Sequence, residues 1–246
     1  MAFVCRGPMK SIVFGLIFAG TASLLGSEAR AAEAPAHVAW GEILVATLLP
    51  SKNEYGSTPS YIRWEGDIGY TAAENRTVCG TFVTLLFQRA YGLKNYDFSA
   101  WMGTASPDAA VYHDAIAAED GFENIAGVND IETGDIIAIK YPPGSSCTGH
   151  VAIVADLPVE LPVAAPILNG ARQFEVVLLD STSTPHGSSD SRVKADGSFD
   201  AGAGSGSMRL YAGPKGQIVG YTWSTESSAI FYDQSERHLV VGRLAL

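Results

Sequence analysis

Three residues that together could carry out nucleophilic acyl transfer occur in order along the chain: Cys79, His150 and Asp180. A cysteine thiolate attacks a carbonyl carbon, and a histidine takes the thiol proton and returns it to the leaving group. A carboxylate then holds the histidine in the useful tautomer. His186, six residues after Asp180, is an alternative for this third role. The residue types therefore predict a cysteine hydrolase whose nucleophile, base and orienting residue lie far apart in sequence.

Cys79 lies at the start of a predicted helix. Apolar residues recur at helical spacing over residues 78–91, and Gly92 follows as a C-terminal stop. In the first turn, free main-chain N–H groups and the helix dipole stabilise an anion, lower the pKa of a thiol and can hold an oxyanion. Gly80 is expected to leave room for a substrate to approach the backbone. The alternative is a buried cysteine that packs as a small apolar side chain.

His150 and Asp180 each adjoin a predicted strand. Residues 136–141 and 151–155 are nearly all apolar and largely β-branched, as in strands buried on both faces, and His150 opens the second of them. Asp180 follows a third apolar run at residues 174–179. Residues 181–206 are rich in Ser, Gly, Asp and Thr, which predicts a long, mobile, unpacked loop beside the cleft.

The N-terminus has the pattern of a secretory signal. Arg6 and Lys10 precede an apolar run at residues 11–26, and small residues at Ala29 and Ala31 suit a signal peptidase. We expect a signal peptide at residues 1–31 and one mature domain at residues 32–246, exported to the periplasm or the outside of the cell. The mature chain has no second apolar run near the ~18 residues that span a bilayer, so no further membrane span is expected.

Net charge argues against nucleic-acid partners. The formal charge is −10, and the sequence contains no Lys/Arg cluster that could neutralise phosphates.

Four segments together resemble the NlpC-like cell-wall cysteine peptidases of the papain-like superfamily, with the CHAP amidases as near relatives. They are C-G-T-F at Cys79, T-G-D-I-I-A-I at Thr133, G-H-V-A-I-V at Gly149 and V-V-L-L-D-S at Val176. The resemblance covers roughly residues 58–183. It implies a papain-like α+β fold in which a helix carrying the cysteine packs on an antiparallel sheet.

The same resemblance implies hydrolysis of amide bonds in peptidoglycan stem peptides. We expect no cofactor and no metal, because the catalytic roles account for Cys79 and His150 and the sequence shows no second cluster of ligands. In this family a tyrosine before the cysteine often lines the oxyanion site, and Tyr61 and Tyr70 are both candidates. Two other functions stay open: acyl transfer or transamidation on another amide or ester, and a catalytically silent domain that binds cell-wall material.

The mature chain keeps two cysteines, Cys79 and Cys147. An even pair in an exported protein can form a disulfide. We expect Cys79 to be free in the active enzyme, and any bond to Cys147 to be a reversible inactive form.

Overall fold

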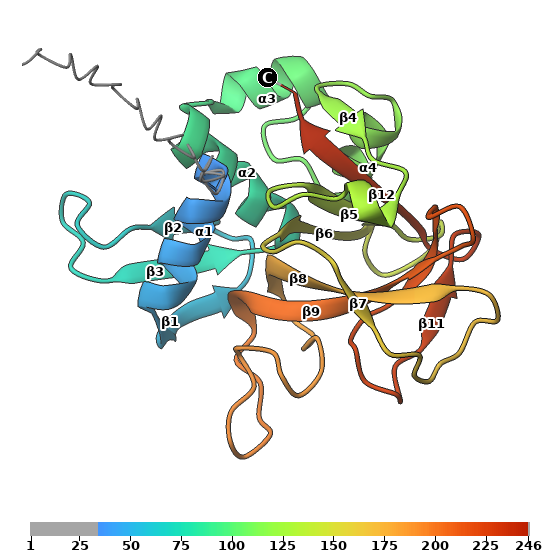
Figure 1. Cartoon of the computed structure of the whole chain (residues 1–246). Coiled ribbons are helices and arrows are strands. Elements are labelled where there is room, and N and C mark those ends of the chain that lie inside the picture. The colour runs from blue at the N-terminus through green and yellow to red at the C-terminus, as the bar shows by residue number, and fades with distance from the viewer. Residues whose placement is uncertain (1–33, 246) are drawn as a thin grey trace, which may run out of the picture. The chain divides into compact units, whose positions relative to one another are not determined.

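A large antiparallel sheet organises the part of the chain described by the computed structural model, residues 34–245, which form one compact unit. Its strand order is β11-β10-β9-β8-β6-β5-β12-β4, and β7 pairs with β8 (Figure 1). The strands are β4 Phe122–Asn124, β5 Ile136–Lys140, β6 Gly149–Val154, β7 Val159–Leu161, β8 Arg172–Thr182, β9 Gly202–Ala212, β10 Ile218–Thr222, β11 Phe231–Asp233 and β12 His238–Leu244.

A smaller sheet precedes the helix that carries Cys79. Strand β3 (Ala73–Thr77) pairs in parallel with β1 (Leu48–Tyr55) and antiparallel with β2 (Tyr61–Arg63). The helices are α1 Ala36–Thr47, α2 Cys79–Tyr91, α3 Asn95–Met102 and α4 Ala109–Ala117, with a 3₁₀ turn at Val128–Asp130. The predicted α+β class is thus confirmed. No helix within residues 34–245 combines the length and apolar character needed to cross a bilayer, and the predicted signal peptide lies outside the described residues.

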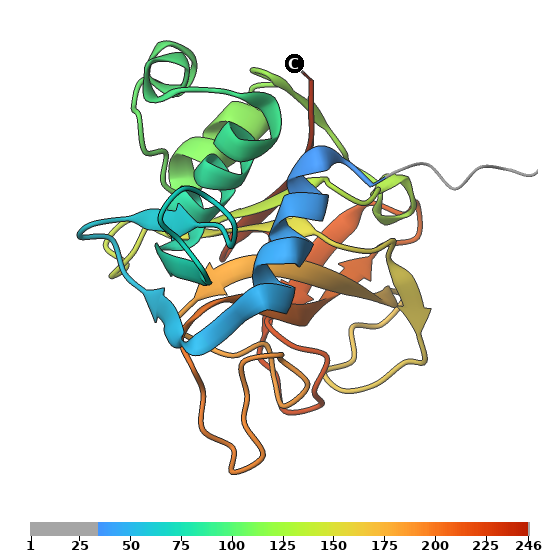
Figure 2. The ribbon, with the colours of Figure 1, turned by 90° about the vertical axis from the view of Figure 1, so that its left-hand side faces the viewer.

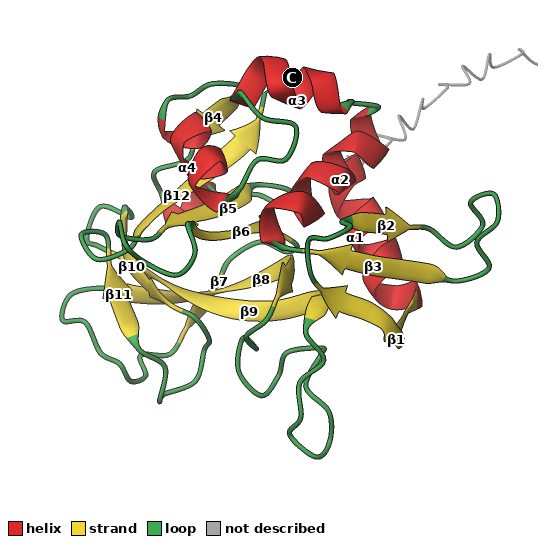
Figure 3. Ribbon diagram, turned by 180° about the vertical axis from the view of Figure 1, so that it is seen from behind, coloured by secondary structure: helices red, strands yellow, loops and turns green. Residues whose placement is uncertain are grey.

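Helices cover one face of the large sheet. The apolar side of α2, with Phe82, Val83 and Leu86, packs in one buried cluster with Val151 and Ile153 of β6. Figure 3 shows α2, α3 and α4 together on one side of the strands, and Figure 2 shows α1 lying across the sheet. The predicted helix over residues 78–91 is confirmed, because Gly92 ends α2 in the left-handed conformation with φ of 73°.

The other face of the sheet is buried as well. In β5, Ile136 and Ala138 face the helices, whereas Ile137 and Ile139 belong to a second buried cluster. The sheet curls around this second cluster, so that the segment after β4 forms a bridge from Gly127 to Gln217 beside β10. The prediction that the strands around His150 are buried on both faces is therefore confirmed.

The prediction that residues 181–206 form an unpacked loop is wrong, although part of this segment does line a cavity, as predicted. Strand β8 continues to Thr182, and β9 begins at Gly202 and pairs with β8 along its whole length. Within the connection His186, Asp190 and Arg192 are buried, whereas the tip at residues 194–198 and several residues between the buried ones are exposed.

The glycines in this segment serve packing. A Cβ at Gly204 would lie 2.7 Å from Arg192 Cδ, and one at Gly206 would lie 2.7 Å from His186 Cβ. Glycine at alternate positions thus clears one face of β9 for the connection that folds over it. The composition that we took as a sign of flexibility is instead a steric requirement.

Gly149, the residue before His150, provides a test of the strand geometry. Its φ is 150°, and a Cβ there would lie 1.8 Å from the carbonyl oxygen of Ile139 in the neighbouring strand. We expect Gly149→Ala to lower the free energy of unfolding by about 3 kcal/mol, because it adds a backbone clash in the central sheet to an unfavourable φ. Urea unfolding measures this.

The matched control for Gly149→Ala is Gly144→Ala, which has φ of 89° but nothing within 4 Å of the added Cβ. It carries the cost of φ alone, about 1 kcal/mol. Equal losses in the two variants would contradict the steric explanation.

Candidate active site

Cys79 is the first residue of α2, and two contacts fix where that helix begins. Tyr55 of β1 pairs with Thr77 of β3, two residues before the cysteine. The hydroxyl of Ser181 in β8 donates to the carbonyl oxygen of Thr77 at 2.8 Å. Val78, at the N-cap, has no side chain that could occupy the N–H groups of the first turn. The helix N-terminus is thus tied to the large sheet with its N–H donors available.

Gly80 has a different role from the one we expected. A Cβ at this position would lie 2.3 Å from the carbonyl oxygen of Pro107. Residues just before α4, rather than a substrate, therefore approach the backbone here. Gly80 allows the two helices to pack closely.

The thiol of Cys79 adjoins the imidazole of His150. Burial would raise the pKa of Cys79, but the hydrogen bond and charge of His150 outweigh it, helped by the main-chain N–H groups of Val151 and Gly80, and the pKa is lowered. Burial would likewise lower the pKa of His150, yet its contacts with Asp180 and Cys79 raise it to about 10. Both shifts favour a thiolate beside an imidazolium at neutral pH.

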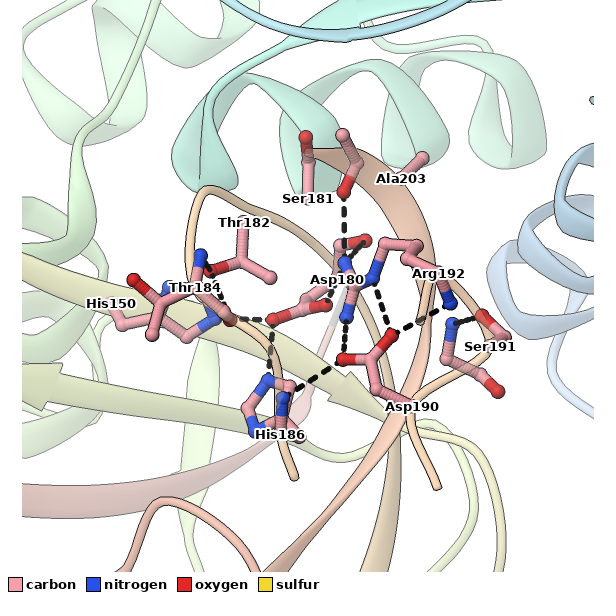
Figure 4. A network of polar contacts seen from close by, with 12 residues as sticks. His150, Asp180, Ser181, Thr182, Thr184, His186, Asp190, Ser191, Arg192 and Ala203 are labelled. Carbon is pink, nitrogen blue, oxygen red and sulfur yellow. Dashed lines mark hydrogen bonds and ion pairs between the residues drawn. The ribbon is translucent and has the colours of Figure 1, made fainter. Parts of the chain in front are cut away.

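Asp180 lies at the centre of a buried polar network (Figure 4). Its Oδ2 accepts hydrogen bonds from His150 Nε2 at 2.7 Å and from His186 Nε2 at 2.9 Å, and its side chain is fully buried. Asp180 is therefore the hydrogen-bond partner of His150, whereas the His186 ring meets the His150 ring edge-to-face, with 6.2 Å between centroids. The His186 ring is held from its other side by the carbonyl oxygen of Trp223, at 2.8 Å from Nδ1.

Arg192 completes this network from the β8–β9 connection. It donates to Asp180 Oδ1 at 2.8 Å and, through two nitrogens, to both carboxylate oxygens of Asp190. Burial would raise the pKa of Asp180, but the charge of Arg192 and the hydrogen bonds from the imidazoles hold it well below its ordinary value. Asp180 is thus ionised at neutral pH and keeps His150 in one orientation.

A cavity of about 670 Å³ opens beside His150. Trp223 forms part of its wall and meets the His150 ring edge-to-face at 4.8 Å between centroids. Aromatic side chains are prominent in the lining, which includes Tyr55, Tyr141, Cys147, Trp223, Tyr232 and Arg237. Its size suits part of a peptide or another small organic group.

Tyr55, and neither Tyr61 nor Tyr70, lines this cavity. The rings of Tyr61 and Tyr70 instead lie under the guanidinium of Arg63. Burial, followed by the charges of Cys79 and Cys147, raises the pKa of Tyr55, so its hydroxyl stays protonated and can donate a hydrogen bond.

Comparison with known proteins places the chain in a family. The chain is 31% identical over 220 residues to uncharacterized protein R653 of Acanthamoeba polyphaga mimivirus, which covers 85% of the chain and 96% of the viral protein. The chain belongs to the same family as R653. No model of a known protein family matches it, and no solved structure is significantly similar.

His150, Asp180 and His186 also have the residue types of a metal site, since their ligand atoms lie within 4.8 Å of one another. The surroundings do not suit a divalent cation. Both imidazoles direct Nε2 at the same carboxylate oxygen, and the cation of Arg192 already occupies the other oxygen. A metal here would have to displace both N–H groups and lie next to a buried guanidinium.

The Gly134-Asp135 pair lies at the far end of β5 and supports the fold. Asp135 accepts a hydrogen bond from the main-chain N–H of Glu132 at 2.8 Å and pairs with Arg243 of β12 at 2.9 Å. The two cysteines of the described chain are free, Cys79 buried and Cys147 exposed at the cavity.

Sequence reasoning missed Tyr55, Trp223 and Arg192. The alternating glycines of β9 were the one local signal for a buried Arg192, because a strand face without side chains must be covered by something. Tyr55 and Trp223 reach the site through strand pairings that no local pattern specifies.

Proposed function

We propose that this protein is an exported cysteine hydrolase of the NlpC-like, papain-like type that cleaves amide bonds, with peptidoglycan stem peptides as the substrate class. The observation that carries the proposal is the Cys79 thiol at the N-terminus of α2, beside a His150 imidazole that the buried Asp180 orients. Such a pair supplies a nucleophile at neutral pH and an acid for the leaving amine.

The chemistry divides into two half-reactions. Cys79 Sγ attacks the carbonyl carbon, the tetrahedral oxyanion collapses, and the amine leaves with the proton from His150. The resulting thioester is then hydrolysed by a water molecule, whose proton passes to His150 as the acyl group leaves as a carboxylic acid. Asp180 stays ionised and keeps His150 in position.

The test of this function combines a thiol probe with product analysis. Purified peptidoglycan is digested by the protein with and without a chelator, and the products are identified by mass spectrometry. We expect new amine and carboxyl ends at one stem-peptide bond. The amount of product should be the same with and without excess chelator. Transfer of the acyl group to an added amine would indicate a transferase. An inert Cys79 with peptidoglycan binding alone would indicate a binding domain and contradict the proposal.

Tyr55 is expected to donate a hydrogen bond to the developing oxyanion. Tyr55→Phe should lower kcat by about 10²-fold, as for loss of one oxyanion donor, because Tyr55 lines the cavity and its hydroxyl stays protonated. Alkylation of Cys79 by chloroacetamide should not change, since this displacement forms no oxyanion. Tyr61→Phe and Tyr70→Phe are the matched controls, and a larger kcat effect in either of them would transfer the role away from Tyr55.

A further inference from the structure

The cavity beside His150 contains a cation without a carboxylate partner in the described chain. Arg237 precedes β12 and is partly buried, and its guanidinium carbon lies over the rings of Tyr141 at 4.2 Å and Tyr232 at 4.0 Å from their centroids. Stacking on aromatic rings holds the guanidinium in place, and the in-plane N–H groups that do not contact the Tyr221 hydroxyl stay available to a planar acceptor.

Of the other arginines of residues 34–245, Arg209 also lacks a carboxylate partner, and its buried Nε has no hydrogen-bond partner, but it lies outside the cavity. Arg209 donates to the main-chain carbonyls of Ala165 and Thr225. The remaining ones each pair with a carboxylate: Arg63, Arg76, Arg89, Arg172, Arg192 and Arg243. In a protein of net charge −10, a cation left unpaired in a cavity is a feature that calls for a ligand.

Sheet register places Arg237 within reach of the reacting group. His150 of β6 pairs with Ile139 of β5, which pairs with Leu239 of β12. These residues share one row across the sheet, and Arg237 lies two positions beyond Leu239. The separation of His150 and Arg237 is therefore about 10 Å across the strands and about 7 Å along them, before the long Arg237 side chain reduces it. A substrate a few bonds longer than the scissile amide can span it.

We propose that Arg237, stacked on Tyr141 and Tyr232, is an anion subsite that binds a carboxylate of the substrate. The inference rests on the proposed function and narrows it: the enzyme acts on acidic amides and peptides, which the guanidinium binds bidentately. Glu226, which lines the same cavity and accepts from the Ser188 main-chain N–H at 2.7 Å, does not neutralise Arg237.

A length series of reactive probes tests the subsite. The probes are N-chloroacetyl derivatives of glycine, β-alanine and γ-aminobutyrate, each as the free acid and as its carboxamide. The Cys79 thiolate forms an S–C bond as the C–Cl bond breaks and chloride leaves. At the matching length we expect the acid-to-amide rate ratio to exceed that of a free thiol by about tenfold.

Three variants test whether Arg237 causes the preference for the acid probes. Arg237→Gln should return it to the free-thiol value, and Arg237→Lys should keep part of the preference. Arg172→Gln, which removes an arginine outside the cavity, should change nothing. A ratio that is the same in the wild type and in Arg237→Gln would overturn the subsite while leaving the hydrolase proposal intact.

Ligand-observed NMR measures how tightly the unreactive N-acetyl acids and amides bind at the same subsite. This measurement does not require Cys79 to react. Tighter binding of the acids, lost in Arg237→Gln, supports the subsite even if Cys79 proves inert, in which case only the proposed function fails. Equal binding of acids and amides in the wild type contradicts the subsite.

Discussion

Cys79→Ala and His150→Gln are each expected to reduce turnover by at least ~10³-fold while the protein stays folded. The two side chains act as one proton-transfer unit, so that loss of either removes most of what the pair contributes. The measurement is the rate of product formation from peptidoglycan or an acidic peptide, with the fold checked by circular dichroism. His113→Gln is the matched control, because His113 is a buried histidine whose ring contacts Asp114 and His238. Comparable loss in His113→Gln would contradict the assignment of His150.

The pH dependence of alkylation and of turnover also tests the pairing of Cys79 with His150. The pKa of Cys79 is lowered and that of His150 is raised to about 10, so the ion pair persists between those two values. Alkylation at Cys79, followed by peptide mapping, should already be fast at neutral pH. In His150→Gln, the pH at which alkylation becomes fast should rise toward or past the ordinary thiol pKa of 9.0. Turnover, unlike alkylation, should fall as the pH rises through about 10, because the leaving amine then lacks its acid. An unchanged alkylation profile in His150→Gln would mean that the histidine does not stabilise the thiolate.

Arg192→Met is expected to destabilise the fold by about 3–5 kcal/mol, or about 10 °C in Tm. The side chain of Arg192 is 3% exposed and lies between Asp180 and Asp190, both fully buried. Removing the guanidinium leaves two buried carboxylates without their cation, which costs far more than loss of a surface pair. Thermal unfolding followed by circular dichroism measures the shift.

Two further variants test that explanation. Lys194→Met removes an exposed cation from the tip of the same connection, where it pairs with Asp200, and should leave Tm unchanged. Adding Asp190→Asn to Arg192→Met should restore part of the loss, because it removes one uncompensated charge. If the double variant is no more stable than Arg192→Met, the destabilisation comes from lost packing rather than charge.

The same network makes stability depend on acid. Because the pKa of Asp180 is held well below its ordinary 3.8, its contribution to stability is present above that pH and lost as the pH falls through the lower, folded-state value. The buried position of Asp180 also makes Asp180→Ala a poor probe of catalysis, since the variant would leave two imidazoles and Arg192 without their shared acceptor. Asp180→Asn keeps the shape and is the better choice.

The sequence alone determined the elements that follow local patterns. Helical spacing and Gly92 gave the bounds of α2 with Cys79 in its first turn, and continuous β-branched runs gave β5 and β6 with His150 at the start of the second. Those patterns are local because a helix or a doubly buried strand imposes its own period on the residues that form it. The choice of Cys79, His150 and Asp180 as candidates follows from them.

Only the tertiary structure decided what surrounds those residues. The hydrogen bond from Ser181 to Thr77 joins residues 104 positions apart, and the parallel pairing of β1 with β3 brings Tyr55 to the cavity. Such contacts depend on which strands become neighbours, which is set by the packing of the whole core and leaves no periodic trace in the sequence. The alternating glycines of β9 show the same limit: composition suggests mobility, whereas the partner that folds over them makes the absence of side chains a condition of close packing.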